Sequence, residues 1–170
     1  LFNGNNISEN EEFNQYLKRL GYLFKNQNHE HSNYVYLQNK KINLFMDVGP
    51  SPEKNFSYTY QAGALSFEFA SNGKKIFTNS GFYNAKNIKL NELSRSSAVH
   101  NTLVIDDNSS CKFEKGADGK FKIKNDLKIK KRDIIFEKNY WKIAAAHDGF
   151  LKKYNLIFER EIQFYPENNR

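Results

Sequence analysis

The sequence predicts an all-β protein, an antiparallel β-sandwich with one short N-terminal helix. Short runs rich in Phe, Tyr, Ile and Val recur roughly every eight to twelve residues, which is typical of sandwiches. Aromatic residues make up 15% of the chain, a content that suits strands better than helices. Turn signals separate the runs, and the strongest is Asn72-Gly73, because both central residues of a type I′ turn need positive φ.

A helix is expected near Ser8–Leu20. Ser8 and Glu11 form a capping box, and apolar residues then recur at helical spacing. Gly21 supplies the C-terminal stop. The sequence predicts no other helix with comparable signals.

The polar segment after this helix holds His29 and His31, a pair of the kind that can bind a metal. No third ligand stands nearby, so we interpret the segment as an exposed loop. We therefore expect a helical connector and loop at residues 1–32 and a sandwich domain at residues 33–170, the whole being part of a longer chain.

The sandwich domain is expected to consist of short strands joined by turns. A Pro-rich break follows residue 47, since proline lacks the amide that a strand ladder needs. In chain order the expected strands are 34–38, 42–48, 58–70, 75–83, 102–105, 121–123, 127–129, 133–137, 140–147 and 154–165.

The net charge of +7 makes an anionic partner reasonable, such as an acidic polysaccharide, a nucleic acid or a lipid surface. The lysines are spread along the strands, however, which is typical of a solvated face, and no nucleic-acid motif is present. No run is apolar enough to cross a membrane, and no signal peptide is visible. Cys111 is the single cysteine, so the chain contains no internal disulfide, and it receives no catalytic role.

Three motifs follow one another in the middle of the chain: Leu65-Ser-Phe-Glu68, Asn79-Ser-Gly81 and Arg95-Ser-Ser-Ala-Val-His-Asn-Thr-Leu103. In this order they resemble the heparinase II/III-like family of polysaccharide lyases. That family has a His-x-His-x-Asp-Ala segment before the first motif, an Asp at the start of the second, and an Arg-Ser/Thr-x-x-His-Asn-Thr/Ser-Leu strand as the third.

The resemblance implies a β-sandwich that works with an N-terminal helical domain, in a periplasmic or secreted enzyme. The implied reaction is β-elimination on a uronic acid polymer, a carbon–oxygen lyase reaction. A base must remove the C5 proton, an acid must protonate the leaving oxygen, and the C5 carboxylate must be neutralised.

The family positions that carry a metal and a catalytic histidine match this sequence poorly. The catalytic His falls on Thr59, the first metal His on Gln61, the neighbouring Asp on Gly63 and the metal Asp on Asn79, while His100 is retained. Neutral amides are poor ligands for zinc, so the resemblance implies a degenerate site (Gln61, Asn79, His100) and zinc or calcium is disfavoured. These three side chains could instead form a metal-free hydrogen-bonded bridge.

Four residues are candidates for binding or catalysis, and each has a structural alternative. His100, Tyr60 and Arg95 are the catalytic candidates, and Arg95, Tyr58 and Tyr60 are the substrate-binding candidates. His100 could be a hydrogen-bonded structural histidine, the tyrosines could belong to the core, and Arg95 could pin a loop carboxylate instead of binding a sugar carboxylate. His147-Asp148-Gly149 is interpreted as a turn cap.

The sequence thus predicts the β-sandwich portion of a polysaccharide lyase that acts on acidic polysaccharide, inactive without its helical domain. The alternative is a non-catalytic carbohydrate-binding or scaffold module with a degenerate metal site. No membrane partner is expected, and nucleic acid is disfavoured.

Overall fold

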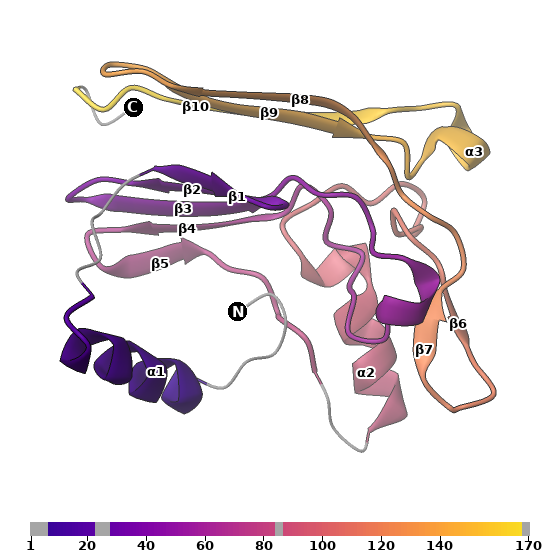
Figure 1. The fold of residues 1–170 in the computed structure, drawn as a ribbon. Helices are drawn as coiled ribbons and strands as arrows, with labels where there is room; N and C mark the ends of the chain where they lie inside the picture. Colours follow the sequence, from indigo (N-terminus) through magenta and orange to yellow (C-terminus); the bar gives the residue numbers. More distant parts are fainter. Residues whose placement is uncertain (1–6, 23–27, 84–86, 168–170) are drawn as a thin grey trace.

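The computed structural model describes residues 7–22, 28–83 and 87–167, and it is an antiparallel β-sandwich (Figure 1). One sheet has five strands in the order β1-β2-β3-β4-β5, and a three-stranded sheet in the order β10-β9-β8 lies over it. The strands of the larger sheet are β1 (His29–His31), β2 (Tyr34–Gln38), β3 (Ile42–Asp47), β4 (Phe67–Ser71) and β5 (Lys74–Phe77). The smaller sheet contains β8 (Ile129–Phe136), β9 (Trp141–His147) and β10 (Phe158–Phe164).

The core lies between the two sheets. Val35 and Leu37 point inward from β2, and Ile143 and Trp141 point inward from β9. Burial alternates along β2 and β3, as a strand with one solvated face requires. The full set of buried core residues is Val35, Leu37, Ile42, Leu44, Met46, Val48, Leu65, Trp141, Ile143, Ala145 and Phe164.

The β2–β3 and β4–β5 hairpins of the larger sheet follow from local turn chemistry, as predicted. The side chain of Asn39 accepts hydrogen bonds from the amides of Lys41 and Ile42, which closes the β2–β3 turn. Asn72 and Gly73 have φ values of 48° and 75°, the pair of positive angles that a type I′ turn needs. Residues 29–31, expected as loop, instead form the edge strand β1, paired with β2. The boundary at residues 32 and 33 stays a prediction.

Two of the expected strands are wrong, 58–70 in its first part and 102–105 as a whole. Residues 58–66 form turns, and only residues from Phe67 onward join the sheet. Residues 102–105 are also irregular, because side chains hold this segment: the hydroxyl of Thr102 donates to the carbonyl of Ala64 at 2.7 Å. The 154–165 strand is shorter than expected and begins at Phe158. The separate strands expected at 127–129 and 133–137 are one bulged strand, β8.

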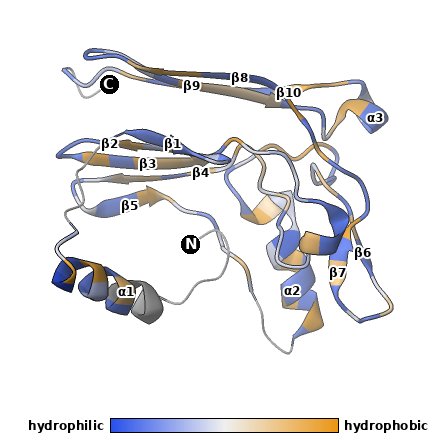
Figure 2. Ribbon diagram, viewed as in Figure 1, coloured by the Kyte–Doolittle hydropathy of each residue, from blue (hydrophilic) through white to orange (hydrophobic). Residues whose placement is uncertain are grey.

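The predicted N-terminal helix is present as α1 (Ile7–Arg19), which carries both hydrophilic and hydrophobic residues (Figure 2). Two further helices were not predicted, α2 (Ile88–Arg95) and α3 (Leu151–Tyr154). α2 begins where the Asn87 side chain accepts the amide of Leu90 at 3.3 Å, an N-cap signal that is visible in the sequence. Among the described residues no helix is both long and apolar enough to span a membrane.

Beside the sandwich stands a separate two-stranded hairpin of β6 (Phe113–Lys115) and β7 (Phe121–Ile123), next to α2 (Figure 1). The short 3-10 helices η1 (Lys54–Phe56) and η2 (Ser97–Val99) lie in the loops of this region. The middle motifs therefore end in a loop-rich lobe attached to the sandwich, and this lobe contains the candidate site.

Candidate functional site

A cavity of about 380 Å³ lies between α2 and the β6–β7 hairpin, and we call it the hairpin cavity. It brings together two predicted substrate-binding residues, Tyr58 and Arg95, with Thr59, the position of the family's catalytic histidine. Two lysines, Lys115 and Lys120, add positive charge to its wall. The other lining residues are Phe82, Ile88, Asn91, Gly119 and Phe121.

Arg95 lines the cavity and also holds the loop at residues 58–60 in place. It is 4% exposed, and its Nη1 and Nη2 donate to the carbonyl oxygens of Tyr60 and Tyr58 at 3.0 and 2.6 Å. Its Nε donates to Asn91 Oδ1 at 3.0 Å. Burial lowers the pKa of Arg95, but its guanidinium remains charged because an arginine pKa lies far above neutrality. Arg95 therefore fixes the loop that carries Thr59, and its partners are carbonyls instead of the loop carboxylate that the sequence suggested.

Three phenylalanine rings surround this guanidinium. The centroids of Phe82, Phe113 and Phe121 lie 5.2, 5.6 and 5.6 Å from Arg95 Cζ. Rings at this distance stabilise a cation through their electron-rich faces, or make apolar contact with the flat guanidinium. The sequence did not predict these three contacts, because the three rings come from separate segments.

The two candidate tyrosines lie in different environments. Tyr58 is 48% exposed, and the Nζ of Lys120 sits 5.1 Å from its ring centroid. Tyr60 is partly buried against Phe113 and Cys111, and burial, followed by the charges that Cys111 and Asp47 carry when ionised, raises its pKa well above the ordinary value. Tyr58 is thus the tyrosine of the hairpin cavity, and Tyr60 faces the second cavity described below.

His100 is buried at the end of η2 and 8% exposed. Its Nε2 lies 3.1 Å from the carbonyl oxygen of Ser94, so Nε2 carries the proton, and its Nδ1 is buried without a hydrogen-bond partner. Burial lowers the pKa of His100, and the bond to Ser94 opposes this shift. His100 is a neutral imidazole against Gly63, whose added Cβ would lie 3.5 Å from the ring.

The donors at the expected metal positions do not fit zinc or calcium. Asn79 Oδ1 accepts the amide of Asn101 at 2.8 Å, and His100 Nε2 is bound to a carbonyl. Gln61 contributes a neutral amide whose buried Nε2 has no partner. In the part of the chain that the structure describes, no three His, Cys, Asp or Glu side chains gather as a metal group would require. No hydrogen bond links the Gln61, Asn79 and His100 side chains to one another among the described contacts.

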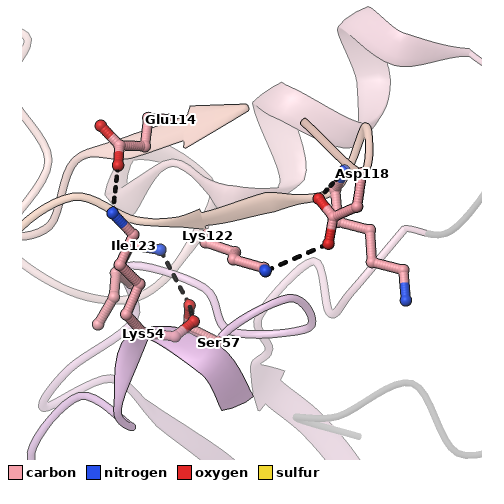
Figure 3. A network of polar contacts seen from close by, with 7 residues as sticks. Lys54, Ser57, Glu114, Asp118, Lys122 and Ile123 are labelled. Atoms are coloured by element: carbon pink, nitrogen blue, oxygen red, sulfur yellow. Dashed lines mark hydrogen bonds and ion pairs between the residues drawn. The ribbon is translucent and has the colours of Figure 1, made fainter. Parts of the chain in front are cut away.

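A polar network docks the hairpin onto η1 (Figure 3). Ser57 is fully buried; its Oγ accepts the amide of Ile123 at 2.9 Å and donates to the carbonyl of Lys54 at 2.7 Å. The ion pair between Lys54 and Glu114 lies beside it at 2.5 Å and is solvent-exposed. The buried hydroxyl is therefore the stronger tether, since exposed pairs contribute little.

Replacing Ser57 with alanine is expected to lower the free energy of unfolding by about 1–3 kcal/mol, because the Ile123 amide is left buried without an acceptor. Urea denaturation measures this. Ser80→Ala is the matched control, since that hydroxyl is exposed and bonds its neighbouring carbonyl, and it should change stability by about 0.5 kcal/mol or less. Equal losses in the two variants would contradict the tether.

A second cavity of about 200 Å³ contains an acid that sequence reasoning missed, Asp47. Asp47 ends β3, is 9% exposed, and accepts the amide of Gly49 at 2.9 Å. Burial raises the pKa of Asp47 to about 7, and the Gly49 bond opposes this shift. Thr59 and Tyr60 also line this cavity, so the 58–60 turn separates the two hollows. The Pro-rich break after Asp47 was the available sequence signal.

The predicted turn cap at His147 is confirmed. His147 Nδ1 accepts the amide of Gly149 at 3.1 Å, and Asp148 accepts the amide of Lys128 at 2.7 Å. Burial lowers the pKa of His147 to about 4. Cys111 is buried and burial raises its pKa to about 12, so its thiol is protonated and unreactive at neutral pH.

Comparison with known families identifies the fold. A family model described as Heparinase II/III-like, C-terminal matches residues 25–170. The chain belongs to this family. No curated protein matches the chain by sequence.

Three solved structures share the fold of this chain. A heparinase III with methylated lysines superposes with a TM-score of 0.66 at 16% identity, and the heparan sulfate lyase HepC from Pedobacter heparinus with 0.62 at 16%. Another heparinase III gives 0.63 at 18%. These matches cover 94%, 93% and 95% of this chain but 25%, 24% and 27% of those chains. The chain therefore spans about a quarter of the lyases it resembles.

Proposed function

We propose that this chain is the β-sandwich portion of a polysaccharide lyase and that its hairpin cavity binds an acidic, uronate-containing polysaccharide. The observation that carries the proposal is the meeting of Tyr58, Arg95, Lys115 and Lys120 around one hollow, at the loop where the family places its catalytic histidine. A uronate carboxylate is an anion, and lysines on a cavity wall neutralise it. The half-exposed ring of Tyr58 offers a flat apolar surface to a sugar face.

The acid and base of a β-elimination are not supplied by the residues of this cavity. Thr59 does not titrate in the range a general base needs, and His100, whose unprotonated Nδ1 is buried, does not line the cavity. Lys115 and Lys120 neutralise the uronate carboxylate and do not remove the C5 proton. We therefore propose that a helical domain of the same protein supplies the proton-transferring groups, and that the sandwich neutralises and positions the substrate.

The same substitutions support a second candidate, a carbohydrate-binding module without catalysis. Thr59, Gln61, Gly63 and Asn79 replace groups that the family uses for catalysis and metal binding. A chain that had lost its chemistry would keep the basic, aromatic wall and lose those groups. The two candidates differ in one measurable property, turnover by the protein that includes a helical domain.

We expect the 170-residue chain alone to form no unsaturated product from uronate polymers, because at least two proton-transferring groups are missing and each is worth about 10²–10⁴ in rate. The measurement is the absorbance of the unsaturated product over a panel of such polymers, with the full-length protein in parallel. Product from the full-length protein alone supports the lyase; no product from either, with retained binding, supports the module. Product from the 170-residue chain contradicts the division of labour proposed here.

Metal content provides a separate check. Elemental analysis of protein purified without chelator is expected to find less than one zinc or calcium per chain, since Gln61 and Asn79 offer neutral amides in place of anionic ligands and Asn79 and His100 are already hydrogen-bonded elsewhere. Stoichiometric metal that is lost in His100→Ala would contradict this.

A further inference from the structure

A third hollow, of about 450 Å³, lies between α3, the base of the β6–β7 hairpin and the loop at 108–110, and we call it the lysine cavity. We propose that the lysine cavity is a second anion-binding subsite that takes a sulfate or carboxylate group of an acidic glycan. This inference rests on the proposed function for its choice of ligand. Lys112, Lys124, Lys152 and Lys153 line it. The other lining residues are Asn108, Ser109, Ser110, Asn125, Gly149, Phe150 and Tyr154.

The four lysines of this cavity form no ion pairs within the described part of the protein. No carboxylate side chain of a described residue lines the cavity. Two nearby acids have other partners: Asp148 pairs with Lys130 at 3.0 Å, and Glu114 with Lys54. A concave surface of one sign concentrates ions of the opposite sign.

The four lysines come in two pairs, and the pair at the hairpin base carries like charges on directly opposite residues. Lys112 and Lys124 face each other across the hairpin base, where the amide of Lys124 donates to the carbonyl of Lys112 at 2.8 Å. Lys152 and Lys153 are consecutive on α3, and the Nζ of Lys153 lies 5.0 Å from the centroid of the Tyr154 ring. Like charges placed opposite one another destabilise a hairpin, and a bound anion between them removes that repulsion.

The frame around the lysines is fixed by neutral groups. The Tyr154 hydroxyl donates to the carbonyl of Ile105 at 3.1 Å and accepts from Asn108, which ties α3 to the 105–108 turn. Asn125 Oδ1 accepts the amide of Lys112 at 3.0 Å, and its NH₂ group has no partner among the described contacts. Buried Phe150 forms the floor. A free amide donor beside four ammonium groups suits the oxygens of a sulfated or carboxylated sugar.

The cavity suits a glycan better than a nucleic acid. Single-stranded nucleic acids are held by aromatic rings on which bases stack. Here one aromatic side chain, Phe150, is 1% exposed, and the other, Tyr154, is only partly exposed and is held by the hydrogen bonds of its hydroxyl. Anionic groups are therefore recognised without a stacking platform.

The lysine cavity shares no lining residue with the hairpin cavity, yet one strand connects them. Lys112 lies just before β6 and Lys115 ends it, so the two residues are about 10 Å apart by the rise of a strand. Because they are three residues apart, their side chains point to opposite faces of the hairpin, and a polyanion that contacts both hollows must cross the hairpin. The lysine cavity would extend the polysaccharide-binding surface beyond the hairpin cavity.

The test is the binding of a sulfated uronate oligosaccharide, measured by calorimetry, to the chain and to paired-lysine variants. Lys152→Gln with Lys153→Gln is expected to weaken binding about fivefold to thirtyfold, since two exposed charge contacts are lost. Lys40→Gln with Lys41→Gln, exposed at the β2–β3 turn, removes the same charge and should change affinity by less than about twofold. Equal effects of the two pairs would overturn the subsite.

Two further arms identify the ligand and separate this inference from the proposed function. If a desulfated oligosaccharide binds the Lys152→Gln, Lys153→Gln variant as tightly as the unmodified chain, the subsite binds sulfate. If the variant still binds it more weakly than the unmodified chain, the subsite binds carboxylate. A single-stranded oligonucleotide that binds as tightly as the glycan, and is weakened by the same variant, overturns the choice of a glycan. If Lys115→Gln with Lys120→Gln weakens binding and Lys152→Gln with Lys153→Gln does not, the lysine cavity is no subsite, while the hairpin cavity keeps its proposed binding role. The reverse result supports the subsite and contradicts the binding role of the hairpin cavity.

Discussion

Arg95→Ala is expected to lower the free energy of unfolding by about 3–5 kcal/mol, a large loss for a single substitution. The guanidinium satisfies two backbone carbonyls and one side-chain oxygen from inside the protein, and its removal leaves these acceptors unpaired. It also opens a void among the rings of Phe82, Phe113 and Phe121. Urea denaturation gives the change, read from the midpoint at constant slope.

Two variants show whether the hydrogen bonds of Arg95 or its positive charge stabilises the fold. Arg95→Lys keeps the charge and loses the fork that reaches both carbonyls, so it should cost about 2 kcal/mol. Arg132→Ala removes a partly exposed arginine that donates to the Ser32 carbonyl and pairs with Glu30, and it should cost less than about 1 kcal/mol. A loss below about 1 kcal/mol in Arg95→Ala would show that the loop at 58–60 holds its shape without this residue.

The parts of the fold that sequence reasoning predicted are those that depend on adjacent residues. The turns at Asn39 and at Asn72-Gly73 close through their own side chain or φ angles, so the hairpins β2–β3 and β4–β5 were predictable. Residues 58–66 alternate in polarity like a strand, but Arg95 and Arg160 reach their carbonyls from other elements. Such tertiary bonds compete with the sheet and leave no periodic signal.

The site shows the same division. The resemblance predicted a degenerate site of Gln61, Asn79 and His100, and none of these three lines the hairpin cavity; the predicted substrate-binding residues Tyr58 and Arg95 do line it. The lysines of that wall were not predicted, because the packing of the hairpin against α2 and not residue type brings them to the cavity. The acid at Asp47 was not predicted, because its burial sets its importance. An aspartate after a strand reads as a turn residue until the structure shows that it is buried.

Asp47 and His147 are expected to give the protein opposing pH dependences of stability. The pKa of Asp47 is about 7, above its ordinary value of 3.8, so between about pH 4 and 7 the folded state binds more protons than the unfolded state. Stability from this group is complete below pH 4 and is lost as the pH rises to 7. The groups around it are the Gly49 amide, which favours the charged form, and the tyrosines Tyr34 and Tyr60 that line its cavity.

His147 acts in the other direction. Its pKa is about 4, below the ordinary 6.5, so between pH 6.5 and 4 the unfolded state binds more protons. Stability from this group is complete above pH 6.5 and is lost as the pH falls to 4. Burial causes the shift; the nearby Asp148 carboxylate opposes it and the Arg160 guanidinium adds to it.

The measurement is the free energy of unfolding in urea from pH 4 to 8 for three variants beside the unmodified chain. Asp47→Asn keeps an acceptor for Gly49 and removes the buried charge, so at pH 8 it should stabilise the protein by about 3 kcal/mol. With Asp47 gone, the remaining histidine should make stability fall by about 3 kcal/mol as the pH drops from 6.5 to 4. His147→Gln should show the opposite slope, a loss of stability from pH 4 to 7, and the double variant should keep only the rise of stability with pH that comes from His100, whose pKa burial also lowers. A profile for Asp47→Asn that runs parallel to that of the unmodified chain would show that this carboxyl ionises normally, and that the cavity beside Thr59 is wet enough to solvate it.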